Sequence, residues 1–84
     1  MSYQIIIKKP AKKFMDRLPA GERKRLVAAI ERLPGLGDIK RLQGQADVFR
    51  LRVGDYRVLF TVDHGALIVC VIAVGNRGEI YKHE

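Results

Sequence analysis

The residues whose type and spacing could support chemistry are arginines near the middle of the chain. Arg50, Arg52 and Arg57 lie in the stretch from Val48 to Val62, where apolar and other residues alternate on both sides of a Gly-Asp pair. Two alternating runs separated by a two-residue Gly-X turn predict a β-hairpin. The turn sets the register, so Arg52 and Arg57 are predicted to lie directly opposite each other.

Two interpretations of this arginine pair are open from the hairpin alone. Like charges that face each other across two strands cost about 0.2–1 kcal/mol, so a function for the pair would explain why both are present. Guanidinium groups match phosphate oxygens in charge and geometry, which favours an anion site. The alternative is a solvated face that protects the sheet edge, with arginine stems packed on Leu59 and the charged ends in water.

The other face of the hairpin is apolar and is expected to form the core, which the remaining elements must cover. A short β-branched segment from Tyr3 to Lys8 predicts a strand. Apolar residues at helical spacing predict one helix from Ala11 to Leu18 and another from about Ala20 to Leu33, which Pro34 ends. The core residues expected from the hairpin are Phe49, Leu51, Val53, Tyr56, Val58 and Phe60.

The segments around the hairpin complete the predicted fold. Residues 34–46 contain three glycines and show no period, which predicts a loop. The apolar run from Ala66 to Val74 predicts a strand covered on both faces in the middle of a sheet, ended or bulged by Gly75 and Asn76. An extended tail follows. The order β-α-α-β-β-β predicts a two-layer α+β fold, in which an N-terminal strand and a helical hairpin pack on an antiparallel β-meander. We expect one domain over residues 1–84.

The charge of the chain favours a polyanionic partner. Sixteen Lys and Arg against nine Asp and Glu give a net charge of +7. Nucleic acid, a ribosome, an acidic protein and an anionic membrane surface all remain possible on this basis. The basic residues Arg23, Lys24, Arg25 and Arg32 in the second helix are either a solvated helix face or an electrostatic footprint for RNA.

Several kinds of site find no support in the sequence. The single cysteine, Cys70, lies in an apolar run and is expected to be a buried apolar residue. His64 and His83 are far apart, so no metal site or cofactor is predicted. No segment reads as a signal peptide or a membrane span, so we expect a soluble, cytoplasmic protein. Glu79, near Arg77, is either a surface ion-pair partner or an acid of functional interest.

Arginines, lysines and Tyr81 can still support cleavage of RNA. RNA provides its own nucleophile, the 2′-hydroxyl group, so the protein has to splay the nucleotide, neutralise charge on the phosphate and move a proton. Arginine suits the second task because its fork of N–H donors fits phosphate oxygens.

Four short motifs in this order resemble the RelE-like toxins of the RelE/ParE toxin–antitoxin superfamily. The resemblance covers nearly the whole chain. The matching segments are Arg41-Leu42-Gln43-Gly44, Phe49-Arg50-Leu51-Arg52, Gly54-Asp55-Tyr56-Arg57-Val58-Leu59-Phe60, and Val74-Gly75-Asn76-Arg77 followed by Ile80-Tyr81.

The resemblance implies a metal-independent, ribosome-dependent endoribonuclease that cuts mRNA in the ribosomal A site by 2′-hydroxyl attack. Arg57 and Arg77 match the family's phosphate-stabilising arginines, and Tyr81 matches its nucleotide-orienting tyrosine. Arg50 and Arg52 match positions that are lysines in the best-known members. The catalytic set that the resemblance implies is Arg57, Arg77, Tyr81 and Arg52. We expect RNA binding by Arg50, by Lys40 and Arg41, which add positive charge beside the hairpin face, and by Lys82 and His83.

The identity of the general base stays open, because arginine is a poor base. Arg52 could act by electrostatics alone while water or the ribosome takes the proton, or Glu79 or His83 could take it. Two other functions compete with cleavage: inhibition of DNA gyrase, as in the ParE branch, and RNA or ribosome binding without activity. The resemblance also implies a cognate antitoxin with an acidic or apolar helical segment.

Overall fold

The structure is a computed structural model that describes residues 3–35, 38–42 and 48–76 of the 84-residue chain. It contains two helices and five strands in the order β-α-α-β-β-β-β. The elements are β1 (Gln4–Ile7), α1 (Lys9–Asp16), α2 (Ala20–Glu31), β2 (Asp38–Arg41), β3 (Val48–Val53), β4 (Tyr56–Asp63) and β5 (Ile68–Asn76).

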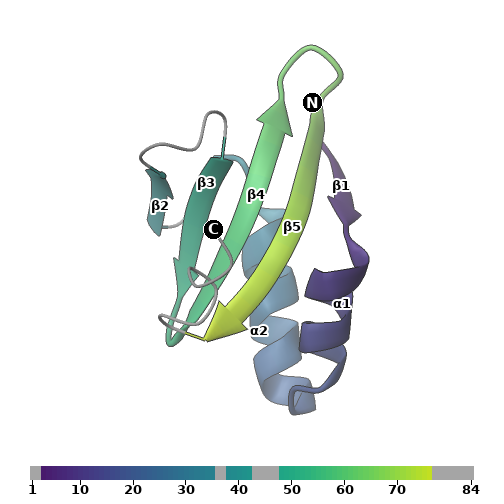
Figure 1. Cartoon of the computed structure of the whole chain (residues 1–84), viewed down its shortest axis with the longest axis vertical. Helices are drawn as coiled ribbons and strands as arrows, with labels where there is room; N and C mark the ends of the chain where they lie inside the picture. Colours follow the sequence, from purple (N-terminus) through teal and green to yellow (C-terminus); the bar gives the residue numbers. More distant parts are fainter. Residues whose placement is uncertain (1–2, 36–37, 43–47, 77–84) are drawn as a thin grey trace.

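The strands form one sheet in the order β1-β5-β4-β3-β2. β2 to β5 pair antiparallel as a meander, and β1 adds parallel to β5. Both helices lie against the same face of the sheet, so the other face has no helix over it (Figure 1). The predicted two-layer α+β fold is thereby confirmed. Neither helix is long and apolar enough to cross a membrane.

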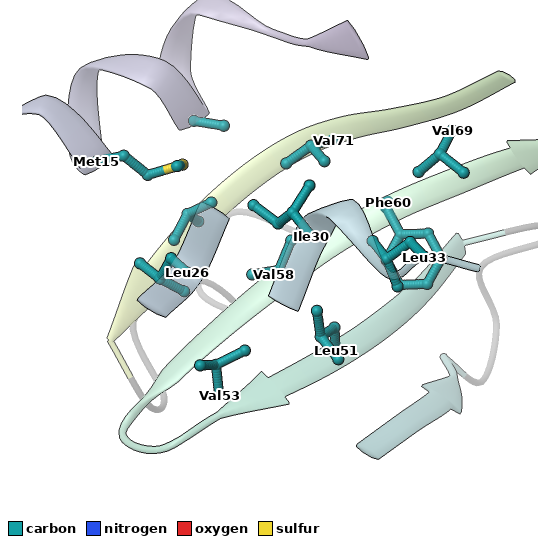
Figure 2. Close-up of a cluster of buried hydrophobic side chains, with 12 residues drawn as sticks. Met15, Leu26, Ile30, Leu33, Leu51, Val53, Val58, Phe60, Val69 and Val71 are labelled. Carbon is teal, nitrogen blue, oxygen red and sulfur yellow. The ribbon is translucent and has the colours of Figure 1, made fainter. Parts of the chain in front are cut away.

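The core lies between the helices and the sheet, as the apolar pattern predicted. Ala11 and Met15 of α1 and Leu26 and Ile30 of α2 are buried. They pack over the strand residues Leu51, Val53, Val58, Phe60, Val69, Val71 and Val74 (Figure 2). Of the hairpin residues predicted for the core, only Phe49 and Tyr56 are half-buried rather than buried, and both pack against the cluster.

The β3–β4 hairpin has the register that its turn predicts. Val53 pairs with Tyr56, Leu51 with Val58 and Phe49 with Phe60 on the side of the helices. Figure 2 shows four of these side chains, those of Leu51, Val53, Val58 and Phe60, on the side of the hairpin that faces the helix residues. The two-residue turn places the whole apolar set on one face, because side chains alternate strictly along a strand.

The prediction of a loop over residues 34–46 was wrong in part, because Asp38–Arg41 forms β2. This strand pairs antiparallel with β3, with Ile39 opposite Leu51 and Lys40 opposite Arg50. Four residues are too few to show a period of two in the sequence. The strand exists because β3 offers an unpaired edge, which is a property of the folded sheet.

The prediction for the apolar run was correct in the position of the strand but wrong in its details. β5 does lie inside the sheet, between β1 and β4. However, Val69 and Val71 are buried under the helices whereas Cys70 and Ile72 are half-buried, so the strand is not covered equally on both sides. The strand continues through Gly75 and Asn76, and its bulge lies at Ile72, where Leu59 and Phe60 pair with Ala73 and Val71.

Candidate functional site

The face of the sheet without helices carries a group of basic residues, which we call the arginine face: Lys40 on β2, Arg50 and Arg52 on β3, and Arg57 on β4. In the register of the sheet, Lys40 lies opposite Arg50, and Arg52 opposite Arg57. The predicted cross-strand pair of arginines is therefore confirmed. Because the strands alternate, these four residues share a face that the core does not use.

Arg57 is the one buried charged residue among those described, with 6% of its surface exposed. Its Nη1 donates hydrogen bonds to the carbonyl oxygen of Tyr56 at 3.1 Å and to that of Gly54 at 3.3 Å. Burying a charge is costly unless it is hydrogen-bonded. The two carbonyls offset part of that cost, and they fix one end of the guanidinium on the hairpin turn.

The other members of the arginine face are more accessible. Arg52 and Lys40 are exposed and Arg50 is half-buried. Leu59, opposite Arg50, is 8% exposed although it does not belong to the core cluster under the helices. Leu59 is therefore covered on the face that the helices leave open. The interpretation that this face protects a sheet edge was wrong for Arg50 and Arg52, because β2 pairs with β3 and takes the edge of the sheet. The anion-site interpretation stays a prediction.

The hairpin turn that holds Arg57 is itself in contact with helix α2. Gly54 has a φ of +59°, while Asp55 has no positive φ, which is the pattern of a type II′ turn. A Cβ atom at Gly54 would lie 3.2 Å from both terminal nitrogens of Arg25. Gly54 is therefore required for its backbone conformation, and it also makes room for the Arg25 guanidinium.

A second contact joins α2 to the same turn through Tyr56. Burial raises the pKa of the Tyr56 phenol, and a hydrogen bond with Glu22 and the negative charges of Glu22 and Asp55 raise it further. The Tyr56 ring also meets that of Phe14 edge to face, with centroids 6.1 Å apart. Both α1 and α2 thus hold the turn whose carbonyls bind Arg57.

The structure brings together only part of the predicted site. Lys40, Arg50, Arg52 and Arg57 share one face, but Arg41 pairs with Phe49 and so lies on the side of the helices. The predictions for the C-terminal segment fall outside the described residues. They concern Arg77, Glu79, Tyr81, Lys82 and His83.

Two contacts of the site were missed by reasoning from sequence: Arg25 over Gly54 and Glu22 with Tyr56. Their helical spacing of three shows that they share a side of α2, but nothing in the sequence indicates that this side meets the hairpin. His64 lies in the turn between β4 and β5, as predicted, and its Nδ1 is 2.7 Å from the Tyr3 hydroxyl oxygen. The described residues contain no group of three or more His, Cys, Asp or Glu side chains that could hold a metal ion.

Comparison with known families identifies the chain. A family model described as the ParE toxin of the type II toxin–antitoxin system parDE matches residues 5–81. The chain belongs to this toxin family. A search of curated proteins finds no match to this chain.

Solved structures place the ParE-family chain close to RelE toxins within the RelE/ParE superfamily. RelE in the RelE–RelB complex from Pyrococcus horikoshii has a TM-score of 0.76 and 28% identity, over 94% of this chain and 99% of that one. The RelB–RelE antitoxin–toxin complex from Methanococcus jannaschii gives 0.74 and 27%, over 93% and 96%. The isolated RelE toxin from E. coli gives 0.68 and 28%, over 98% and 94%. The predicted resemblance to RelE-like toxins is thus confirmed.

Proposed function

We propose that this toxin is a metal-independent endoribonuclease that cleaves mRNA in the A site of the ribosome and thereby blocks translation. The observation that carries the proposal is the opposed pair Arg52 and Arg57, with the Arg57 guanidinium fixed by the carbonyls of Gly54 and Tyr56. A preorganised donor stabilises a charged transition state because it does not have to reorient during the reaction.

The chemistry follows from the substrate. The 2′-oxygen of a ribose attacks the adjacent phosphorus, a new P–O2′ bond forms, and the P–O5′ bond breaks. The 2′-hydroxyl proton goes to a base, and the departing 5′-oxygen takes up a proton. Arg57 would stabilise the negative charge that develops on the non-bridging phosphate oxygens. Arg52, directly opposite and exposed, would be the first of the pair to meet the RNA backbone.

The burial of Arg57 sets a condition on this mechanism. Only 6% of the residue is exposed, so a phosphate group reaches its guanidinium only after the surrounding side chains move apart. The exposed cations Arg52 and Lys40 would attract the RNA before that step. In the family pattern Arg77 adds a second phosphate contact and Tyr81 orients the nucleotide, with Lys82 and His83 close to the RNA.

A translation reaction with purified ribosomes and a defined mRNA tests the proposal. Primer extension would locate cuts made by the wild type and by the Arg57→Ala and Arg77→Ala variants. We expect cuts at A-site codons with the wild type and loss of these cuts in both variants. Intact mRNA with the folded wild type would refute the nuclease, and wild-type cleavage by both variants would refute the site.

Gyrase inhibition is the second candidate, and the match to a ParE family model favours it. A supercoiling assay with purified gyrase distinguishes the two functions. Inhibited supercoiling together with intact mRNA would establish the gyrase inhibitor instead of the nuclease. Blocked translation with intact mRNA and active gyrase would point to a protein that binds the ribosome without cleaving RNA.

We also propose that a cognate antitoxin binds this chain. The structures from Pyrococcus horikoshii and Methanococcus jannaschii are complexes of RelE with RelB. An antitoxin with an acidic or apolar helical segment would complement the basic chain. Co-expression with a candidate antitoxin from the same genome, followed by co-purification, tests this partner. Recovery of the toxin alone would contradict it.

A further inference from the structure

The two carbonyl oxygens that bind Arg57 belong to residues that helix α2 contacts. Arg57 Nη1 donates to the carbonyls of Gly54 and Tyr56. The Arg25 guanidinium lies 3.2–3.3 Å from the position that a Cβ atom at Gly54 would take. Glu22 accepts a hydrogen bond from the Tyr56 hydroxyl group. Because Glu22 and Arg25 are three residues apart, the same side of α2 meets both ends of the turn.

Tyr56 is held at two points of its side chain. Its ring meets that of Phe14 edge to face, with centroids 6.1 Å apart and an interplanar angle of 74°. Its hydroxyl group donates to the Glu22 carboxylate. A tyrosine side chain has only two rotatable χ angles, so contacts at the ring and at the hydroxyl group together restrain the backbone that carries it. The Tyr56 carbonyl, which accepts from Arg57 at 3.1 Å, is part of that backbone.

Tyr56 and Arg57 are consecutive residues of β4, so their side chains point to opposite faces of the sheet. The side chain of Tyr56 contacts the helices, whereas Arg57 belongs to the arginine face. A contact made on the helix side is therefore transmitted to the guanidinium through a single peptide group. This matters for catalysis because a group that stabilises a transition state must be held within about 0.5 Å of its productive position.

We infer that Glu22 and Tyr56 are positioning residues for Arg57: the bond between their side chains keeps the Tyr56 carbonyl where it holds the guanidinium ready for a phosphate group. This inference rests on the proposed function, in which Arg57 stabilises the charge on the phosphate. Glu22 and Tyr56 act through Arg57 and touch no reacting atom. The competing explanation is a contact that stabilises the fold and has no effect on the guanidinium.

Paired substitutions test the two explanations. Tyr56→Phe removes the hydroxyl group but keeps the ring beside Phe14. Tyr3→Phe is its matched control: the Tyr3 hydroxyl oxygen is also hydrogen-bonding, at 2.7 Å from His64 Nδ1, but this contact lies at the β4–β5 turn, at the other end of β4 (Figure 1). Glu22→Ala removes the acceptor, whereas Glu22→Gln keeps an amide oxygen that can accept. Glu22 is exposed, so its variants guard against misfolding of Tyr56→Phe.

Single-turnover cleavage of mRNA at varied ribosome concentration separates kcat from KM. We expect Tyr56→Phe and Glu22→Ala each to lower kcat about tenfold and to leave KM unchanged. This is less than the loss of about 10²–10³ for removing the donor itself, and within the factor of about 10² that a 1 Å displacement can cost. Glu22→Gln should recover most of the rate, and Tyr3→Phe should cleave as the wild type does.

The same substitutions in an Arg57→Ala background form a double-mutant cycle. We expect the losses from Tyr56→Phe and Glu22→Ala to disappear there, because no guanidinium is left to position. Losses of equal size with and without Arg57 would overturn the inference, as would a change in KM alone. Cleavage by both single variants at the rate of the wild type would overturn it too.

A measurement without RNA keeps this inference distinct from the proposed function. The ¹⁵N order parameter of the Arg57 Nε–H group should be near the rigid value of about 0.85 in the wild type and Tyr3→Phe, and should fall below about 0.6 in Tyr56→Phe and Glu22→Ala. If it falls while the folded wild type leaves mRNA intact on ribosomes, the nuclease proposal fails and the positioning stands. If the wild type cleaves and the order parameter is the same in all variants, the inference fails and the nuclease stands.

Discussion

The solvent-exposed side of helix α1, with Lys9, Lys13 and Arg17, and the arginine face of the sheet present positive charge in opposite ways. Lys9, Lys13 and Arg17 are exposed side chains with no fixed geometry required of them, whereas Arg57 is buried and bonded to two backbone carbonyls. Mobile exposed charges give affinity that falls steeply with salt. A fixed, desolvated charge gives geometry, which a transition state needs more than the bound substrate does. Net charge therefore indicates where a polyanion binds but not where it reacts.

Replacing Arg57 should show most clearly whether the buried charge of the arginine face acts on the rate of cleavage or on binding. We expect Arg57→Ala to lower kcat for cleavage by about 10²–10³, because one preorganised donor is lost. Arg57→Lys should recover little, since an ammonium group keeps the charge but not the planar fork. Single-turnover cleavage at saturating ribosomes measures this. If both variants instead changed KM alone, Arg57 would be a binding residue and not one that stabilises the transition state.

Gly54 lies where α2 meets the turn whose carbonyls bind Arg57. Replacing Gly54 should therefore disturb both the stability of the fold and the position of the Arg57 guanidinium. A side chain at φ +59° costs about 1–2 kcal/mol in the folded state. We expect Gly54→Ala to lose this free energy of unfolding in urea titrations and to slow cleavage.

The double variant Gly54→Ala with Arg25→Ala identifies the cause of that loss. The Arg25 guanidinium is the far end of a flexible side chain. It can move aside from the Cβ atom of an alanine at position 54, which would lie 3.2 Å from it. The double variant should therefore be no more stable than Gly54→Ala. Full recovery would show that the contact, and not the backbone conformation, makes glycine necessary.

Arg52→Gln tests whether the arginine face gives up stability for function. Arg52 lies opposite Arg57 on β4 and also opposite Asp38 on β2, so the variant is compared with its parent in an Asp38→Asn background. There, removing the charge opposite Arg57 should raise the free energy of unfolding by about 0.2–1 kcal/mol and lower the rate of mRNA cleavage. The gain should shrink at high salt, because Arg52 is exposed and its repulsion is screened. A loss of stability at low salt would mean that the pair is not repulsive in the folded protein.

Tyr56→Phe probes the junction between the two regions through pH. The pKa of Tyr56 is raised above its ordinary 10.0 in the folded protein. The unfolded chain therefore releases this proton first as pH rises, and the stabilising contribution, complete below about pH 10, is lost above it. Urea unfolding at pH 8 and pH 10.5 should show a smaller alkaline loss for Tyr56→Phe than for the wild type. Equal losses of stability in the two proteins would mean that a group other than Tyr56 titrates.

The hairpin shows how much of the site could be predicted from sequence. A Gly-Asp turn between alternating runs determines the register, and the register determines that Arg52 and Arg57 are neighbours. The same reasoning could not predict how far each of the two arginine side chains is exposed to solvent. Arg52 is exposed and Arg57 buried, a difference that depends on the carbonyls of the turn and on the packing around them.

Strand β2 shows the opposite case. Its four residues have too little pattern to be recognised, and their strand conformation comes from pairing with β3. That pairing also decides that Lys40 joins the arginine face while Arg41 does not. Their positive charge beside the hairpin predicted both as RNA-binding residues, but only the register of the sheet separates them.

The sequence by itself determined the local and periodic features: the hairpin and its register, both helices, the core face and the family. These follow from turn chemistry and from side-chain periods that act over a few residues. Only the tertiary structure decided the pairing of β1 with β5, the edge strand β2, the contacts of Arg25 and Glu22 with the turn, and the placing of two basic regions on opposite sides. Those features depend on which surfaces meet, and residues far apart in the chain meet only after the core has formed.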